Sequence, residues 1–292
     1  MDTNDVKLIE KVCNITGLFY PISTAIKRIT DNKDSLRALQ NEYDKSFREE
    51  ILNRDMNDIA KAALISASSK SIKEFVNQAT ILGIAIENLG DSADPKNLDD
   101  DWLFFFMNKA ATITDEQMRY TWGKILAEAC EDPEICSKTL INTLSLISKW
   151  QAEAFQNICR FRMINMDIPA NENKISTYPI IFLSKSFDGY AFNGITYKGI
   201  SALEQLGLIS IDSHKEFVVY TDLLKVRDYR NSVEVISNNK KVEIGNIIFT
   251  DDGYLLQKII DPYYSSKITD YNVQIWLYKK YQVYVNGIKQ NI

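Results

Sequence analysis

The sequence has few of the residues from which catalytic and metal sites are usually built. Its 292 residues include one histidine, His214, and four cysteines, Cys13, Cys130, Cys136 and Cys159. No CxxC pair occurs, so a zinc site would need distant cysteines to converge. A nucleophile elbow, a P-loop and a Rossmann glycine pattern are also missing. We therefore expect no catalytic residue, metal or cofactor, although an enzyme with a site assembled from distant residues stays an alternative.

Long apolar runs and an excess of basic residues are absent as well. The longest apolar runs, at 81–86 and 102–107, are six residues each, against the roughly 18 needed to cross a bilayer. The net charge of −5 disfavours a strongly basic nucleic-acid binder but leaves room for a local basic patch. The acidic N-terminus lacks the apolar segment of a signal peptide. These features predict a cytoplasmic protein with reduced cysteines and no transmembrane segment.

Six prolines and eleven glycines are too few for long disordered linkers. Apolar residues at helical spacing predict that residues 1–163 are all-helical, and the composition shifts towards strands after residue 171. We expect a mainly α protein, a helical bundle with a long helix, followed by a smaller α+β domain. The expected divisions are a docking segment or hairpin (1–30), a long helix with a following helix (31–90), a compact helical core (91–170) and the α+β domain (171–292).

The first two divisions contain amphipathic segments that need a partner. Residues 5–29 fit a helical hairpin docked on the body of the protein, which we favour over a helix lying on a membrane surface. Residues 31–67 predict one uninterrupted helix, because no proline or glycine interrupts it. Its partner lies within the chain or in a second copy, and we expect a homo-oligomer. The candidate interface residues, spaced by three and four, are Leu36, Leu39, Tyr43, Phe47 and Ile51.

The stretch DDDWLFFFMNKA, residues 99–110, places acids directly before a run of large apolar residues. Adjacent acids point in different directions on a helix, which is a poor geometry for chelation. A calcium loop would alternate its ligands and contain a glycine, and this segment does neither. Asp100 or Asp101 instead suits a helix N-cap. The apolar run predicts a helix at 100–111 that is buried all round. Thr114 with Gln117 predicts a capping box at the next helix, and Ser148 with Gln151 predicts the same pattern at the start of a helix over 148–163. The expected core residues are Trp102, Phe105, Phe106, Trp122, Leu126 and Phe155.

The last division predicts a winged-helix-like arrangement. Strands are expected at 178–183, 208–211, 216–220 and 232–236, with a helix at 195–206. NNKK (238–241) is expected to form a hairpin turn before VEIGNIIFT, and strands are expected again at the C-terminal YNVQIWLYKKYQVYV. In a DNA-binding version the helix would enter the major groove and 225–241 would form the wing. The candidate nucleic-acid-binding residues are Lys198, Lys225, Arg227, Arg230, Lys240 and Lys241.

Several of these patterns occur together in one known family. Asp101-Trp102, Thr114-Asp115-Glu116, Trp122 to Ala127 and Ile147 to Phe155, with the later ALEQLGLISI and IGNIIFTDDGYLLQKI, make the chain resemble the bacterial family catalogued as domain of unknown function 2806. Two positions depart from the family pattern. The chain has Ala127-Glu128-Ala129 where the family often has Ala-Gly-Glu, and Asp261-Pro262 where it often has Cys-Gly.

The resemblance implies no established activity. It implies a cytosolic bacterial protein, and some members look like antiphage-defence genes. We therefore expect a non-enzymatic sensor or interaction protein in phage defence, self-associating through the long helix. The alternatives are a nucleic-acid-binding regulator that uses the C-terminal domain, and an effector enzyme.

Overall fold

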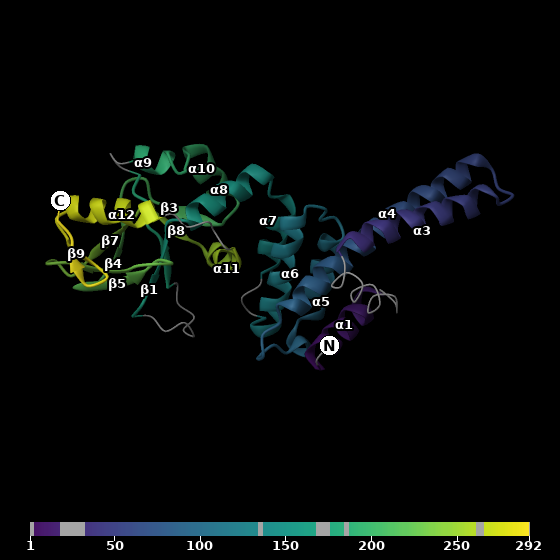
Figure 1. The fold of residues 1–292 in the computed structure, drawn as a ribbon, viewed down its shortest axis with the longest axis horizontal. Coiled ribbons are helices and arrows are strands. Elements are labelled where there is room, and N and C mark those ends of the chain that lie inside the picture. Colours follow the sequence, from purple (N-terminus) through teal and green to yellow (C-terminus); the bar gives the residue numbers. More distant parts are fainter. Residues whose placement is uncertain are drawn as a thin grey trace. The chain divides into compact units, whose positions relative to one another are not determined.

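The computed structural model describes residues 3–17, 33–133, 137–167, 176–183, 187–260 and 266–291, apart from the side chains of 33–40, 187–188 and 266–269. The chain divides into two compact units (Figure 1), which we call the helical unit, Met1–Ser145, and the sheet unit, Leu146–Ile292. The expected class is confirmed at this level, because helices predominate and an antiparallel sheet region follows them. Within the described ranges, no helix combines the length and apolar character that crossing a bilayer requires.

The helical unit is built from one short docking helix, a helical hairpin and a group of shorter helices. These elements are α1 (Thr3–Thr16), α3 (Lys33–Leu52), α4 (Asp58–Glu87), the 3-10 helix η1 (Pro95–Asn97), α5 (Asp100–Ala110), α6 (Glu116–Glu131) and α7 (Lys138–Leu146).

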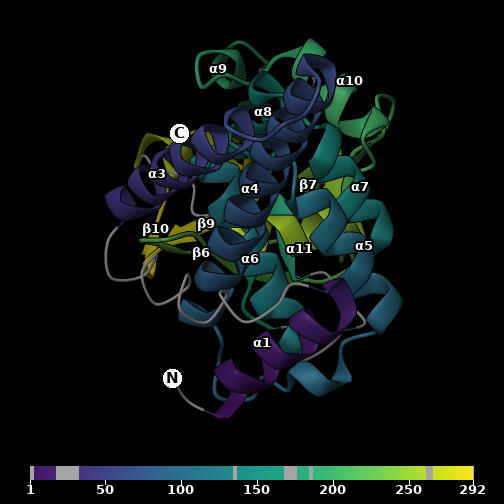
Figure 2. The ribbon, with the colours of Figure 1, turned by 90° about the vertical axis from the view of Figure 1, so that its right-hand side faces the viewer.

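The predicted single helix over 31–67 is wrong, because the chain turns at 53–57. Asn57 caps α4, and its side-chain oxygen accepts a hydrogen bond from the Ala60 amide at 2.8 Å. Asparagine and aspartate compete with the helix for backbone hydrogen bonds, so a turn forms without proline or glycine. Helix α3 then runs alongside α4 (Figures 1 and 2), and the partner of the long amphipathic segment lies within the chain.

Helix α5 begins one residue earlier than the sequence predicts. Its N-cap is Asp99, whose carboxylate accepts from the Trp102 amide at 2.7 Å. The predicted burial on all sides is also wrong, because Phe104 is 51% exposed and Phe105 is half-buried. The buried side carries Trp102 and Phe106, since only one face of this helix packs against the rest of the unit.

An aromatic cluster holds the centre of the helical unit. The ring of Phe106 lies 5.1 Å from Trp102 and 5.0 Å from Trp122, measured between centroids, and Leu126 is buried on α6 with Trp122. The cap of α6 is Asp115, whose carboxylate accepts from the Met118 amide, rather than the predicted Thr114.

Helix α1 docks on the helical unit through its apolar face, with Leu8, Ile9 and Val12 buried. Lys11 forms an ion pair with Asp100 at 2.9 Å and donates to the carbonyl of Leu98. The apolar face available to a membrane surface is therefore already covered in 3–16. The second half of the predicted hairpin, around residues 18–29, lies outside the described residues.

The sheet unit begins with α8 (Lys149–Cys159), which packs against α10 (Tyr197–Gln205). The other helices are α9 (Phe187–Ala191), α11 (Asp251–Ile259) and α12 (Ser266–Tyr278). The strands are β1 (Arg162–Asn165), β2 (Thr177–Pro179), β3 (Ile209–Ile211), β4 (Phe217–Val219), β5 (Leu223–Arg227), β6 (Ser232–Ile236), β7 (Val242–Gly245), β8 (Ile247–Phe249), β9 (Gln282–Val285) and β10 (Ile288–Lys289). The core of this unit includes Phe155, whose ring lies 5.9 Å from that of Phe249.

Ten strands form one large and two small antiparallel sheets in the described part of the chain. The large sheet has the order β10-β9-β6-β5-β1-β2, and the pairs β3-β8 and β4-β7 are separate. Two local predictions are wrong here. The NNKK sequence joins strands of different sheets instead of closing a hairpin, and 271–278 belong to α12 instead of a strand. Apolar side chains bury one face of α12 against the unit, and this packing outweighs the strand preference of its tyrosines.

The two C-terminal segments that resemble the family pattern lie against each other. Thr250 caps α11 and donates its hydroxyl to the carbonyl of Gly207 at 2.5 Å. A Cβ atom on Gly253 would lie 1.8 Å from the carbonyl oxygen of Leu208, so only glycine permits this approach of α11 to the chain before β3. The Thr-x-x-Gly spacing therefore has a structural explanation.

We predict that Asp99→Ala lowers the free energy of unfolding by about 1 kcal/mol, because the Trp102 amide loses its acceptor at the positive end of α5. Urea titration followed by circular dichroism measures the change. Asp99→Asn is the matched control and should keep most of the stability, since its side-chain oxygen still accepts. A larger loss in Asp101→Ala than in Asp99→Ala would contradict the assigned cap.

Candidate nucleic-acid interface

The middle strands of the large sheet have one buried face and one accessible face. Val226, Val233 and Val283 are fully buried, and their neighbours along each strand are half-buried or exposed. Side chains alternate between the two faces of a strand, so these neighbours form a second face, which we call the outer face. In Figure 1, α9, α10 and α12 lie on one side of β5.

The register places charged and aromatic residues side by side on the outer face. Lys225 is opposite Glu234, Glu234 is opposite Tyr284, and Tyr284 is opposite Lys289. Residues directly opposite each other in antiparallel strands have Cβ atoms about 5 Å apart and share a face. The row therefore carries two lysines, one tyrosine and one glutamate across β5, β6, β9 and β10.

Arg227 extends the basic character of the outer face by one row. It is exposed and lies opposite Ser232 on one side and Ile164 on the other. Beyond Ile164 the face is covered, because Arg162 donates hydrogen bonds to the Gln257 side chain and to the carbonyl of Ile260, at the end of α11. The accessible area thus comprises β5, β6, β9 and β10.

Three other predicted basic residues lie at the two ends of the β5–β6 hairpin. Arg230 belongs to the tight turn after β5, in which the carboxylate of Asp228 accepts from the Arg230 amide at 2.7 Å. Lys240 and Lys241 follow β6, at the opposite end, and both are exposed. Lys240 and Lys241 therefore lie at the end of the hairpin away from Arg227 and Arg230.

Lys198 lies elsewhere, on the helices of the sheet unit. Its ammonium is 4.6 Å from the centre of the Trp150 ring, a cation–π contact between α10 and α8. Helix α10 buries Gly199, Ile200 and Leu203, and Glu204 accepts from the amide of Ile211. Its accessible side therefore offers one cation for a phosphate backbone, as the sequence indicates.

Sequence reasoning missed Tyr284 and Lys289, which the pairing of β9 with β6 brings to the outer face. It also missed Tyr229, which is 72% exposed beside Arg230. The alternation in YQVYV was visible, but no local signal shows that this segment pairs with 232–236, more than 45 residues earlier.

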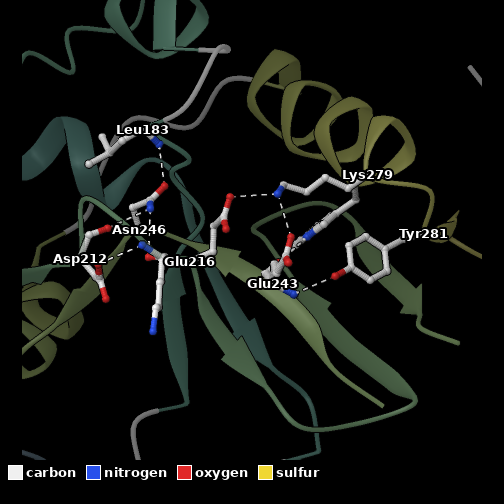
Figure 3. Close-up of polar contacts among 9 residues, drawn as sticks. Leu183, Asp212, Glu216, Glu243, Asn246, Lys279 and Tyr281 are labelled. Carbon is white, nitrogen blue, oxygen red and sulfur yellow. Dashed lines mark hydrogen bonds and ion pairs between the residues drawn. The ribbon is translucent and has the colours of Figure 1, made fainter. Parts of the chain in front are cut away.

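A separate polar cluster joins α12 to the strands β4 and β7 (Figure 3). The Lys279 ammonium donates to Glu216 at 3.0 Å and to Glu243 at 2.7 Å. The Trp276 indole donates to the carbonyl of Glu243, and the Tyr281 hydroxyl accepts from its amide. These contacts surround one half-buried cation with two carboxylates, which is an arrangement that could hold or transfer a proton.

The proton affinity of Lys279 decides between those roles. Burial by itself would lower the pKa of this ammonium, but the hydrogen bonds and charges of Glu243 and Glu216 outweigh burial and raise the pKa above its ordinary value. A general base or an amine nucleophile needs a lowered pKa. The cluster therefore serves to fix the end of α12.

The remaining candidates for covalent chemistry are also unsuited to it. Burial raises the pKa of the Cys130 and Cys159 thiols to about 12, so neither forms a thiolate near neutral pH. His214 is exposed, and its amide donates to Asp212 in a turn. In the described part of the chain, no group of three His, Cys, Asp or Glu residues is placed to hold a metal ion, and Cys136 lies outside that part.

We predict that Lys279→Met lowers the free energy of unfolding by about 1–2 kcal/mol near neutral pH, because two part-buried carboxylates lose their shared donor. The raised pKa of Lys279 sets the pH dependence. Its contribution is complete below the ordinary lysine pKa of 10.5 and is lost as the pH rises through the higher folded-state pKa.

The difference between wild type and Lys279→Met should therefore shrink in urea titrations at increasingly alkaline pH. Lys280→Met, which removes the exposed neighbouring lysine, is the control and should be neutral. A Lys279→Met variant as stable as wild type at pH 7 would contradict the assigned role.

Comparison with known proteins gives the family of this chain. Searches of curated proteins and of solved structures find no match. A family model described as "Protein of unknown function (DUF2806)" matches residues 67–271, which is more than half of the chain and includes parts of both units. The chain therefore belongs to the DUF2806 family.

Proposed function

We propose that the protein is a non-catalytic binding protein that holds single-stranded nucleic acid on the outer face of its sheet unit. The observation that carries this proposal is the cross-strand row in which Tyr284 lies between Glu234 and Lys289, with Lys225 beyond Glu234. Arg227 adds a third cation in the adjacent row. Single-strand binders combine cations that contact the backbone with aromatic rings on which bases stack.

A single strand suits this surface better than a duplex. A sheet face several strands wide, at about 4.8 Å per strand, is too broad to enter a groove of double-stranded DNA. Unpaired bases, in contrast, are free to stack on a tyrosine in a sheet. A winged-helix mode has weaker support, because Lys198 is the one cation near the start of α10 and the predicted wing strands are β5 and β6, inside the large sheet.

Charge indicates the strength of the interaction. Three cations on the outer face are offset by Glu234 on the same face and by the net charge of −5. Single-strand binding loses about 0.7 decades of affinity per decade of salt for each neutralised phosphate. Three phosphate contacts therefore give an expected log–log slope of about −2.

We predict that Lys225→Ala with Arg227→Ala reduces the affinity for a fluorescein-labelled single-stranded RNA by roughly tenfold at low salt and flattens the salt slope to about −0.7. Tyr284→Ala should weaken binding by about 1–3 kcal/mol and leave the slope unchanged, since it removes stacking and no charge. Fluorescence anisotropy on the full chain measures both quantities, with single-stranded DNA and duplexes as further probes.

The matched control is Lys215→Ala with Lys280→Ala, which removes two exposed lysines outside the outer face. It should retain the wild-type affinity. An equal loss in the control pair would mean that only total charge matters, and an absence of binding to any single strand at low salt would end the proposal.

Self-association is a second candidate function, favoured by apolar residues on the α3–α4 hairpin. This hairpin extends away from α5 and α6 (Figure 1), and it exposes 54% of Tyr43 and 82% of Ile59. Of the predicted interface residues, Ile51 is buried and Phe47 stacks on Tyr43 with centroids 6.2 Å apart. The side chains of Leu36 and Leu39 lie outside the described residues. A role in phage defence rests on the family resemblance and stays a prediction.

If the hairpin binds a second copy of the chain, Tyr43→Glu with Ile59→Glu should convert the oligomer to a monomer, because both charges would be desolvated at the contact. Both positions are exposed, so folding should be unaffected. Light scattering coupled to gel filtration measures the mass. Glu42→Gln with Glu49→Gln, also exposed on α3, is the control, and an unchanged mass in the Tyr43 and Ile59 variant would exclude this surface.

A further inference from the structure

A groove in the helical unit, separate from the outer face, runs along α4. Arg48 of α3 forms one wall, α4 forms the other, and the end is closed by the loop between α5 and α6. Its volume is about 640 Å³, within the 300–1,000 Å³ typical of small-molecule sites. The lining on α4 extends from Ala62 to Asn77, which is roughly 22 Å at 1.5 Å per residue. The groove therefore suits an elongated ligand.

Cations from two helices line this groove. Arg48 comes from α3, and Lys70 and Lys73 come from α4. Lys70 is paired with Glu74 at 3.7 Å. In the part of the chain that the structure describes, Arg48 and Lys73 have no carboxylate within ion-pair distance. Two exposed cations are thus available to a ligand from different walls.

The acidic groups near the groove are already engaged. Glu74 belongs to the pair with Lys70, and the carboxylate of Asp44 accepts a hydrogen bond from the Ser69 hydroxyl at 3.1 Å. The Ser69 oxygen can still accept a second hydrogen bond. The local balance of charge therefore favours an anion.

The remaining lining combines hydroxyl groups with apolar side chains. Ser66, Thr112 and Thr114 provide hydroxyls, whereas Ile65 and Ala111 provide apolar surface. Hydroxyls and cations together are the groups that hold phosphate oxygens, and the apolar part could contact a ring. A simple inorganic anion would leave that part unused.

The closed end of the groove is held rigidly. The Asn77 amide donates to the carbonyl of Ala111 at 2.7 Å, and its oxygen accepts from the Arg119 guanidinium at 2.5 Å. Arg119 also donates to the carbonyl of Ile113. The loop that carries Thr112 and Thr114 is therefore fixed to α4, so a ligand would meet a preformed surface at this end.

We propose that this groove binds a nucleotide that carries more than one phosphate. The nucleoside contacts Ala111 at the closed end, and the phosphates extend along α4 past Lys73 and the neighbouring hydroxyls towards Arg48. Separate cations along an elongated groove fit several phosphates better than one. The site lies in the helical unit and shares no residue with the outer face. Nucleotide binding in the groove and nucleic-acid binding on the outer face can therefore be tested independently of each other.

Isothermal titration calorimetry on the full chain tests the proposal, with ATP, GTP, inorganic triphosphate and adenosine as probes. At least one nucleotide should bind at millimolar or lower concentration and more tightly than triphosphate, and adenosine should bind at least tenfold more weakly. Arg48→Ala with Lys73→Ala should reduce the nucleotide affinity at least tenfold. Both side chains are exposed, so the variant should give the wild-type circular dichroism spectrum.

The matched control is Lys45→Ala with Lys138→Ala, two exposed lysines of the helical unit that do not line the groove. This control, and the Lys225→Ala, Arg227→Ala variant of the outer face, should bind the nucleotide as wild type does. The proposal is overturned if neither nucleotide binds, if triphosphate binds as tightly as the nucleotides, or if the control pair loses affinity equally.

Discussion

The register of β5, β6 and β9 is the constraint on which the outer face depends. Side chains alternate with a period of two, so a slip of one residue would bury Lys225 and Arg227 and expose Val226. Burying unpaired cations costs far more than an ordinary side-chain contact provides. The valines in the middle of these strands therefore place the cations on the accessible side. Asn286, whose side chain accepts from the Ser232 amide at 2.9 Å, joins the turn after β9 to the start of β6.

The helical unit depends on a different constraint, the satisfaction of free amides at helix starts. Asp99, Asp115 and Asn57 each accept from an amide three residues later, and each fixes where a helix begins. These starts position the two groups of side chains that matter most in the unit. The aromatic cluster around Phe106 forms the core, and the turn before Asn57 brings Arg48 of α3 to the groove along α4.

The sequence was most informative where one local pattern decides the structure. The run at 102–107 predicts α5, and Ser148 with Gln151 predicts the start of α8, where the Gln151 side chain accepts from the Ser148 amide. Hydrophobic periodicity gave the wrong prediction where tertiary packing, or side chains that compete for backbone hydrogen bonds, decide the secondary structure. The turn at 53–57 has no proline or glycine, and the tyrosines of 271–278 favour a strand that tertiary packing overrides.

The outer face and the groove show the same limit of prediction from sequence. Lys225 and Arg227 are a visible basic pair, but Tyr284 and Lys289 join them only through the pairing of β9 with β6. The groove is harder to predict from the sequence than the outer face. Arg48 and Lys73 line the same groove only because α3 and α4 form a hairpin. Each site depends on a contact between segments with no shared local motif, and a single sequence contains no signal for such a contact.

The most direct test of the account is to locate the nucleic acid on the protein. Full-length chain would be photo-crosslinked to a single-stranded RNA that contains 4-thiouridine, and the modified peptides would be identified by mass spectrometry. The account predicts crosslinks in the peptides of β5 and β9, with Tyr284 as the principal site. Crosslinks confined to α10 or to the helical unit, with none in β5 or β9, would contradict it.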